Sequence, residues 1–236
     1  MNGLSDGVDR AAAMAQALAA RPATARVAIC PPASLLERIS RATKASGVEL
    51  GGQDCHAESS GAFTGDISAE MLADAGASLV ILGHSERRVS HAESDPIVAA
   101  KVTAGLRAGL EPIVCVGESL DQREAGEAAR VVESQLRGSL PQMLKGRQFT
   151  VAYEPVWAIG SGLTATLEDI IAMHSGIRAT LVEMFGDEGR RASILYGGSV
   201  KPSNAAEILH APGVGGALVG GASLKAEDFL GIIYAV

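Results

Sequence analysis

The stretch 111-EPIVCVGE-118 is a short apolar run, rich in Val and Ile, that ends in a glycine and a carboxylate. The stretch 150-TVAYEP-155 repeats this pattern after an intervening segment. Runs of this kind are typical of strands buried on both faces of a parallel sheet. Five further runs follow the same pattern: 27-VAICP-31, 48-VELGGQD-54, 79-LVILGH-84, 193-SILYGG-198 and 216-GALVGG-221. The sequence therefore predicts seven parallel strands.

The segments between these runs carry helix signals. Residues 33–46 have an apolar stripe and are followed by Gly47 as a stop signal. Thr166 and Asp169 have the spacing of a capping box. Alternation of strands and helices predicts an α/β fold with right-handed crossovers. The first predicted helix, residues 5–20, has no strand before it, so a closed barrel of eight strands and an open sheet of seven both remain compatible with the periodicity.

The composition predicts one domain spanning residues 1–236, a length that suits a single α/β barrel. The net charge of −7 argues against a broad nucleic-acid surface. Cys30, Cys55 and Cys115 are odd in number and far apart, which is typical of reduced thiols in a cytosolic protein. No apolar run approaches the ~18 residues of a membrane span, and the start does not resemble a signal peptide. We therefore expect a cytoplasmic protein.

Glu154 lies at the end of an apolar run and is followed by Pro155. Catalytic groups collect at the C-terminal ends of strands in barrels and in open α/β sheets alike. A carboxylate partly shielded from water at such a position is suited to act as a general base. A carboxylate paired with a neighbouring Lys or Arg is the alternative, and the residues alone leave both open.

His84 ends another strand and is followed by a helix-like turn, Ser85 to Arg88. The dipole of a helix start favours the neutral form of a histidine. A neutral imidazole can donate a hydrogen bond to a carbonyl without supplying a full charge. A histidine that is satisfied by the local backbone is the simpler interpretation.

The segment 155-PVWAIGSGLTA-165 is apolar and rich in glycine. Gly160 and Gly162 could absorb large dihedral changes, while Trp157 and Ile159 could cover a ligand. These are the properties of a lid that excludes water. On composition alone, an ordinary loop between a strand and a helix is the favoured alternative.

Two glycine pairs end the last two predicted strands: Gly197–Gly198, followed by Ser199, and Gly220–Gly221. Glycine lets the backbone approach a phosphate closely, and a following helix start adds unpaired N–H donors. Barrels often bind phosphate after strands seven and eight, so the two pairs favour a phosphate site over two simple turns. The sequence contains no G-x-G-x-x-G, Walker lysine or H-E-x-x-H motif, which disfavours a nucleotide cofactor or a metal.

Several of these motifs together resemble the triosephosphate isomerase family, in its order and at its spacing, across essentially the whole chain. The matching motifs are GHSERR (83–88), CVGE (115–118), AYEPVWAIGSG (152–162), YGGS (196–199), LVGGASL (218–224) and GAFTGDIS (61–68). The resemblance implies a TIM (β/α)8 barrel, with seven of its eight strands identifiable here. It also implies interconversion of glyceraldehyde 3-phosphate and dihydroxyacetone phosphate without a cofactor or a metal.

The resemblance assigns roles to residues of this sequence. Glu154 would move the proton through an enediolate, and His84 would polarise the carbonyl oxygens. Glu86 and Cys115 would support the site. The residues of the lid and of the phosphate site would be Ile159, Gly160, Ser161, Ser199, Gly220 and Gly221. The family members are typically homodimers, so the resemblance implies a homodimer formed through the loop around Phe63 and Thr64.

The chain departs from the family's pattern at its start. The family's first strand ends in a segment like N-W-K-M-N-G, and this chain begins at the Met of that segment, with Met1, Asn2 and Gly3. We therefore expect the first strand and a catalytic lysine to be missing, with a weakened barrel and a lower turnover as the result. A misplaced start codon, unrecorded upstream residues and a natural short form would each explain this start. Leu163 stands where a lysine is common in the family.

Two other functions remain compatible with these residues. One is a related isomerase that acts on a four-carbon ketose phosphate, because the same Glu and His would serve either substrate. The other is a catalytically silent barrel retained for binding or assembly. Its weakness is that Glu154, His84 and the full lid segment are all present.

Overall fold

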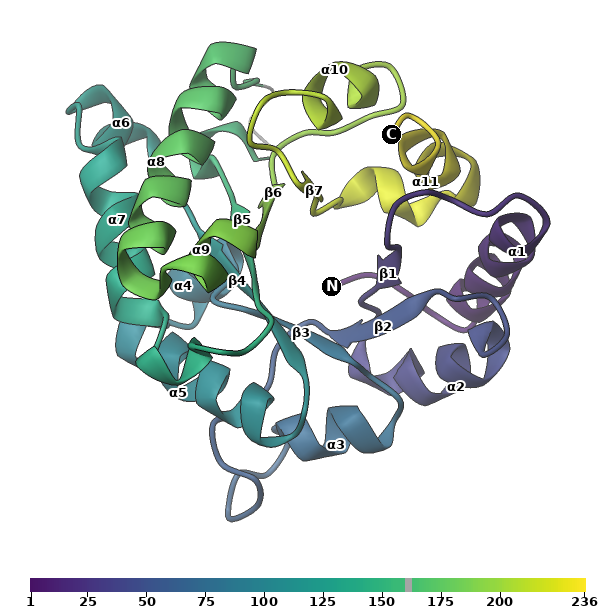
Figure 1. Cartoon of the computed structure of the whole chain (residues 1–236). Coiled ribbons are helices and arrows are strands. Elements are labelled where there is room, and N and C mark those ends of the chain that lie inside the picture. Colours follow the sequence, from purple (N-terminus) through teal and green to yellow (C-terminus); the bar gives the residue numbers. More distant parts are fainter. Residues whose placement is uncertain (160–162) are drawn as a thin grey trace.

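The computed structural model describes residues 1–159 and 163–236, which fold around one parallel sheet (Figure 1). In this part of the chain the sheet has seven strands, arranged in the order of the sequence. They are β1 (Ala28–Ile29), β2 (Glu49–Gly52), β3 (Leu79–Leu82), β4 (Glu111–Val116), β5 (Thr150–Tyr153), β6 (Ser193–Tyr196) and β7 (Gly216–Ala217). All seven predicted strands are confirmed. Each is shorter than predicted, mostly because its last predicted residues already belong to the loops that follow.

The sheet curls around a central space, with β1 and β7 at its two ends (Figure 1). A doubly wound sheet would reverse its strand order at a switch point, whereas this order runs from β1 to β7 without reversal. Among the described residues, β1 and β7 do not pair with each other. The strand order is therefore that of the predicted (β/α) barrel and not that of a doubly wound sheet, and within the described residues the seven strands curl without closing.

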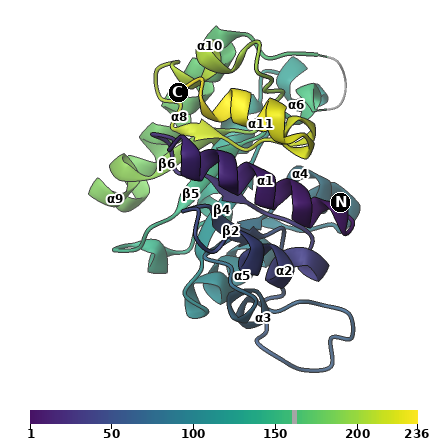
Figure 2. The ribbon, with the colours of Figure 1, turned by 90° about the vertical axis from the view of Figure 1, so that its right-hand side faces the viewer.

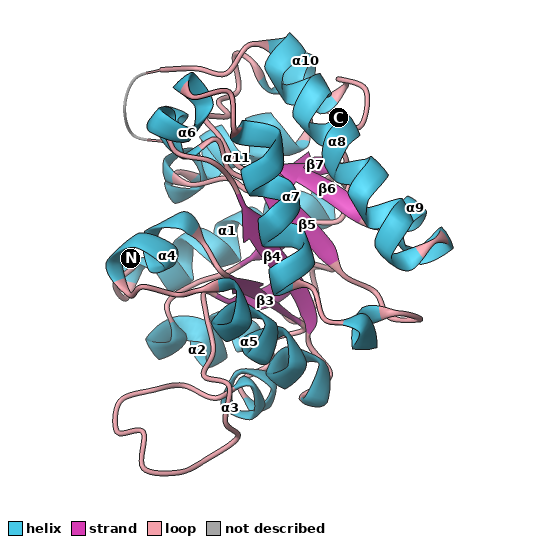
Figure 3. Cartoon of the chain, turned by 90° about the vertical axis from the view of Figure 1, so that its left-hand side faces the viewer, coloured by secondary structure: helices cyan, strands magenta, loops and turns pink. Residues whose placement is uncertain are grey.

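Helices cover the outer face of the sheet, as two side views show (Figures 2 and 3). They are α1 (Asp6–Ala20), α2 (Ala33–Thr43), α3 (Ala69–Asp74), α4 (Ser85–Ser90), α5 (Asp95–Arg107), α6 (Leu120–Glu124), α7 (Ala128–Ser139), α8 (Leu167–Phe185), α9 (Asp187–Arg191), α10 (Ala205–Leu209) and α11 (Ala226–Ile233). Short 3-10 turns form η1 (Gln142–Leu144), η2 (Val156–Ala158) and η3 (Gly221–Leu224). Within the described residues, no helix is long and apolar enough to span a membrane.

Two helices begin at side chains that cap their first backbone N–H groups. The predicted capping box at the start of α8 is confirmed: the Asp169 N–H donates to the Thr166 hydroxyl at 3.1 Å, and the Thr166 N–H donates to Asp169 at 3.2 Å. Ser119 and Gln122 form a second capping box at the start of α6. Each box satisfies two backbone N–H groups that a helix start otherwise leaves without a partner.

Successive side chains of each strand point alternately to the outer and the inner face of the sheet, and each face has its own apolar cluster. Side chains such as Val80 and Val114 point outward into the main core between sheet and helices. Their neighbours Ile81, Ile113 and Cys115 point inward and form a smaller cluster inside the barrel. Because successive strand residues face opposite sides, a strand buried on both faces must be apolar throughout. This explains the continuous apolar runs of the sequence.

His174 packs α8 against the sheet from the outside. It is fully buried, its Nδ1 lies 3.1 Å from the Gly213 carbonyl oxygen, and its ring meets the Tyr153 ring edge-on at 5.9 Å. Because only a donor can bind that carbonyl, Nδ1 carries the proton of the neutral ring. Burial lowers the pKa of His174, although the bond to Gly213 opposes the shift.

We expect His174 to make the protein less stable as the pH falls below the ordinary histidine pKa of about 6.5. In that window the unfolded chain binds a proton that the folded chain resists, so the free energy of unfolding falls with the pH. Urea unfolding at pH 7.5 and at pH 5 should therefore show a smaller acid loss for His174→Asn, which keeps a donor toward Gly213, than for the unaltered protein. The exposed His91→Asn is the control, and an unchanged acid loss in His174→Asn would contradict this account.

Candidate active site

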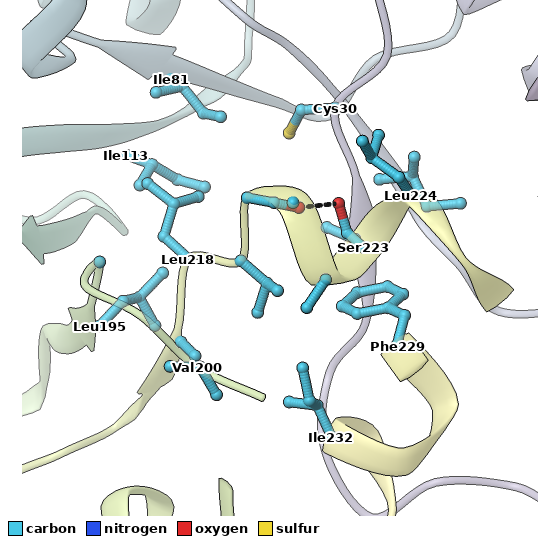
Figure 4. A pocket seen from close by; sticks show the side chains of 18 of the residues that line it. Cys30, Ile81, Ile113, Leu195, Val200, Leu218, Ser223, Leu224, Phe229 and Ile232 are labelled. Carbon is cyan, nitrogen blue, oxygen red and sulfur yellow. Dashed lines mark hydrogen bonds between the residues drawn. The ribbon is translucent and has the colours of Figure 1, made fainter. Parts of the chain in front are cut away.

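A cavity of about 1960 Å³ lies along the inner face of the sheet and reaches the C-terminal ends of the strands. Its walls are largely apolar: Ile81, Ile113 and Leu195 face it from the sheet, and Phe229 and Ile232 face it from α11 (Figure 4). His84 and Glu154 line the same cavity. An apolar cavity with a few polar groups at one end is the usual form of a small-molecule site.

Glu154 and His84 meet at the strand ends, although 70 residues separate them in the sequence. Glu154 directly follows β5 and is 2% exposed, while His84 follows β3 and stands immediately before α4. The His84 Nε2 lies 2.8 Å from the Glu154 Oε1. The Ser85 backbone N–H donates to the other carboxylate oxygen, Oε2, at 2.9 Å. Both oxygens of this nearly buried carboxylate therefore have a fixed partner.

The protonation of His84 follows from its two neighbours. Its Nδ1 accepts the Glu86 backbone N–H at 3.3 Å, so the proton of the neutral ring sits on Nε2 and points at Glu154. Burial opposes a charge on this ring, but the hydrogen bond and charge of Glu154 outweigh it and raise the pKa of His84. This shift is opposite to the one we expected from the helix start alone, because that expectation did not include the carboxylate.

The two supporting residues of the sequence analysis, Cys115 and Glu86, lie close to this pair in different elements. Cys115 is fully buried on β4; burial raises the pKa of its thiol, and the nearby charge of Glu154 adds to the shift. Such a thiol stays protonated, so it contributes packing rather than a nucleophile. Glu86 stands in the first turn of α4, where its side chain is exposed and lines the cavity.

Backbone contacts on both sides hold Glu154 in place. Its N–H donates to the Val116 carbonyl at 2.8 Å, which extends the β4–β5 ladder by one residue. On the other side, Gly197 donates to the Tyr153 carbonyl at 2.7 Å, and a Cβ on Gly197 would lie 2.9 Å from the Glu154 Cγ. A Cβ on Gly117 would lie only 1.7 Å from the Glu154 carbonyl oxygen. Glycine is therefore required at both neighbours.

The segment after Glu154 is anchored at both of its ends by side chains. Near its start, the Trp157 indole N–H donates to the fully buried Glu118 at 2.8 Å. At its far end, Asp169 of the α8 capping box binds Arg123 at 2.5 Å. Arg123 also stacks over the Trp157 ring at 4.6 Å, so one side chain contacts both ends. Ile159 lines the cavity, whereas the predicted lid residues Gly160 and Ser161 lie outside the described residues.

The predicted phosphate-binding residues line the cavity that contains Glu154. Ser199 follows β6, and Gly220 and Gly221 stand at the start of η3. In the described part of the chain, the N–H groups of Ser199 and Gly220 donate to no other residue. The Gly220 carbonyl accepts the Ser223 hydroxyl at 2.7 Å, which fixes the turn (Figure 4). The structure thus brings these glycines, Glu154 and His84 to one cavity.

A family model described as triosephosphate isomerase matches residues 1–236, which is the whole chain. The chain belongs to the triosephosphate isomerase family. A triosephosphate isomerase of Caulobacter vibrioides is 63% identical over 236 residues, covering 100% of this chain and 93% of that protein. One of Ruegeria pomeroyi is 55% identical over 100% of this chain and 94% of its own length. The crystal structure of triosephosphate isomerase from Bartonella henselae superposes with a TM-score of 0.92 at 46% identity, covering 100% of this chain and 94% of that one.

Membership in the triosephosphate isomerase family agrees with the resemblance of the sequence motifs. The matches do not support the expected N-terminal shortening, because the family model aligns from the first residue of this chain to the last. Sequence reasoning missed three groups around Glu154: Ser85 and Gly117, which contact it, and Gln135, which binds Gly117. The first two act through their backbones, which leave no side-chain signal, and Gln135 acts on Gly117 from a helix.

Proposed function

We propose that the chain interconverts glyceraldehyde 3-phosphate and dihydroxyacetone phosphate, with Glu154 as the general base and His84 as the hydrogen-bond donor to the carbonyl oxygen. The observation that carries this proposal is the 2.8 Å contact between His84 Nε2 and Glu154 Oε1 at the C-terminal ends of two barrel strands. A base and a donor that already touch can act on neighbouring atoms of one small substrate.

The contact between His84 and Glu154 suggests how a bound substrate would engage the two side chains. The substrate carbonyl oxygen takes the Nε2–H of His84, and this releases Oε1 of Glu154. The freed carboxylate removes the proton from the carbon next to the carbonyl, and the electron pair of that C–H bond forms an enediolate. Glu154 then delivers a proton to the former carbonyl carbon, while the hydroxyl proton moves from the oxygen that becomes the new carbonyl to the oxygen of the former one. Departure of Glu154 from His84 removes the contact that raises the pKa of His84. The imidazole is then a neutral donor when the enediolate forms.

The phosphate group of the substrate would sit on backbone N–H donors. We assign this role to Ser199, Gly220 and Gly221, because all three line the cavity and the N–H groups of the first two have no acceptor among the described residues. Gly160 would add a further donor, and Ile159 with Ser161 would cover the bound substrate; these roles rest on the family resemblance. Backbone donors bind phosphate without positive side chains, which fits a chain with a net charge of −7.

A triose substrate is favoured over a four-carbon ketose phosphate by the names of the relatives, which are triosephosphate isomerases at 52–63% identity. A silent binding barrel is disfavoured because the His84–Glu154–Ser85 contacts are all formed. The test is turnover of the purified chain on glyceraldehyde 3-phosphate and on a four-carbon ketose phosphate. We expect turnover on the triose phosphate to exceed that on the larger sugar at least tenfold. The reverse preference, or no turnover on either, would contradict the proposal.

We also propose that the chain forms a homodimer through the loop that contains Phe63 and Thr64. Residues 57–67 extend away from the barrel as a long loop (Figures 1 and 3). The loop is closed at its base, where the His56 N–H donates to the Ile67 carbonyl at 2.8 Å, and Phe63 packs on His56 at a ring distance of 4.1 Å. Phe63 nevertheless remains 43% exposed. An exposed aromatic on a protruding loop is suited to insert into a partner subunit.

We expect Phe63→Asp to halve the molecular mass measured by light scattering, because a charge would have to be buried in the interface. The exposed Met143, on the short turn η1, provides the matched control as Met143→Asp, which should leave the mass unchanged. A dimer that survives Phe63→Asp, or a monomeric unaltered chain, would contradict the assignment of the interface to this loop.

A further inference from the structure

Gln135 does not line the cavity, yet it binds both backbone groups of Gly117. The Gly117 N–H donates to the Gln135 Oε1 at 2.7 Å, and the Gln135 Nε2 donates to the Gly117 carbonyl at 3.0 Å. A flipped amide would set donor against donor and acceptor against acceptor, so these two bonds define its orientation. The side chain therefore gives Gly117 the two bonds that a residue in a sheet receives from a neighbouring strand.

Gly117 is the residue that lies directly against the backbone of Glu154. On either side of it, the Val116 carbonyl accepts the Glu154 N–H at 2.8 Å, and the Glu118 carbonyl accepts the Val156 N–H at 3.1 Å. The space between Gly117 and the Glu154 carbonyl is too small for a methyl group. Any movement of Gly117 toward β5 would therefore push Glu154, and any movement away would remove the surface against which it rests.

The helix that carries Gln135 is itself tied to the strand ends. Helix α7 packs across the outside of the sheet near β4 (Figure 3). One turn after Gln135, the Ser139 hydroxyl accepts the Arg88 Nη2 at 3.0 Å. Arg88 also donates to the Gly83 carbonyl at 2.8 Å and to the Cys115 carbonyl at 3.2 Å. Helix α7 is thus fixed to the end of β4 at two points, by Gln135 at Gly117 and by Ser139 through Arg88 at Cys115.

We propose that Gln135 is a positioning residue for Glu154, acting through the backbone of Gly117. This inference rests on the proposed function of Glu154 as the general base. Without the amide, a partly buried N–H and carbonyl would lose their partners, and a glycine with wide conformational freedom would no longer be held. The carboxylate would then sample positions from which the proton is out of reach, and an error of 1 Å in such a position lowers a rate by about a hundredfold.

The test is Gln135→Met, which keeps an unbranched side chain of similar length but cannot form either bond. We expect kcat to fall by roughly tenfold to a hundredfold, with KM changed less than about threefold, because the loss affects proton transfer rather than phosphate binding. Proton abstraction becomes slower relative to the other steps, so the primary isotope effect with glyceraldehyde 3-phosphate deuterated at C2 should increase. Gln142→Met, the same change at an exposed site on η1, should leave kcat, KM and the isotope effect unchanged.

A second readout does not depend on activity. Amide hydrogen exchange followed by NMR should be at least several-fold faster at Gly117 and Glu154 in Gln135→Met than in Gln142→Met, because one bond is lost and the adjacent ladder loosens. A wild-type kcat in Gln135→Met, unchanged exchange at Glu154, or a loss of activity that follows only the loss of folded protein at a constant isotope effect would overturn the inference. Absence of turnover in the unaltered chain would contradict the proposed function instead, and the exchange rates would then decide alone whether Gln135 holds the strand end.

Discussion

Replacement of Glu154 by glutamine is expected to lower kcat by about a thousandfold, within the range of about 10²–10⁴ that a positioned general base contributes. The amide has nearly the same shape as the carboxylate and can still accept the Ser85 N–H, which lies 2.9 Å from Oε2 in the unaltered protein. It cannot accept a proton from carbon. The fold should therefore survive while the proton-transfer step is lost. The measurement is steady-state kinetics on glyceraldehyde 3-phosphate together with a thermal unfolding curve.

The exposed Glu168 on α8 provides the control for this change. Glu168→Gln removes the same charge from the protein but should leave kcat within about twofold, because surface charges distant from a site contribute little to it. Retention of more than about a tenth of the wild-type kcat by Glu154→Gln would mean that another group removes the proton. The assignment of the base would then be wrong even if the chain is an isomerase.

The second large effect is expected from Gly117→Ala, a change of one methyl group outside the cavity. The added Cβ would lie 1.7 Å from the Glu154 carbonyl oxygen and 2.7 Å from its carbonyl carbon. Both atoms belong to the backbone of Glu154, directly after β5, and cannot rotate aside. The ends of β4 and β5 must therefore separate. We expect a loss of about 3 kcal/mol in the free energy of unfolding, at the upper end of typical overpacking costs. Turnover of the folded fraction should fall by about a hundredfold, because Glu154 moves with its backbone.

Gly176→Ala is the matched control, since Gly176 lies on the exposed face of α8 and a Cβ there would meet no atom within 4 Å. Alanine is favoured over glycine inside a helix by up to about 1 kcal/mol, so this variant should be as stable as the unaltered chain or more stable. Urea unfolding and kinetics on both variants separate the two effects. Wild-type stability and turnover in Gly117→Ala would show that β4 and β5 are not in close contact at this point.

The order and type of the barrel elements could be predicted because each strand carries its own signal. Runs such as residues 79–84 and 111–118 are apolar on both faces, since one face meets the helices and the other lines the barrel interior. Thr166 and Asp169 mark the start of α8 through a purely local pair of hydrogen bonds. Glu154 and His84 could be chosen as candidates because both stand where such runs end. Each of these signals is local in the sequence, so it can be recognised without knowing which strands or helices pack together.

The remaining features of the site depend on contacts between distant residues. The carboxylate that raises the pKa of His84 is 70 positions away in the sequence, so the helix start alone predicted the opposite shift. Ser85 and Gly117 contact Glu154 through backbone atoms, for which a residue type is no guide. Gln135 lies on a helix among other polar residues. Its two hydrogen bonds to the Gly117 backbone distinguish it from them, and these bonds are visible only in the folded structure. Periodicity also could not distinguish a curled sheet from an open one, because both use strands buried on two faces.

The central claim, that Glu154 moves a proton between adjacent carbons of a triose phosphate, is tested most directly by isomerisation in D₂O. The chain should convert glyceraldehyde 3-phosphate to dihydroxyacetone phosphate with deuterium entering the carbon that receives the proton, because a proton held by Glu154 can exchange with solvent before it returns. NMR of the product should show this label with the unaltered chain, and labelled product should form about a thousandfold more slowly with Glu154→Gln at equal concentration. Turnover without any deuterium incorporation, or equal labelled product from Glu154→Gln, would contradict the account.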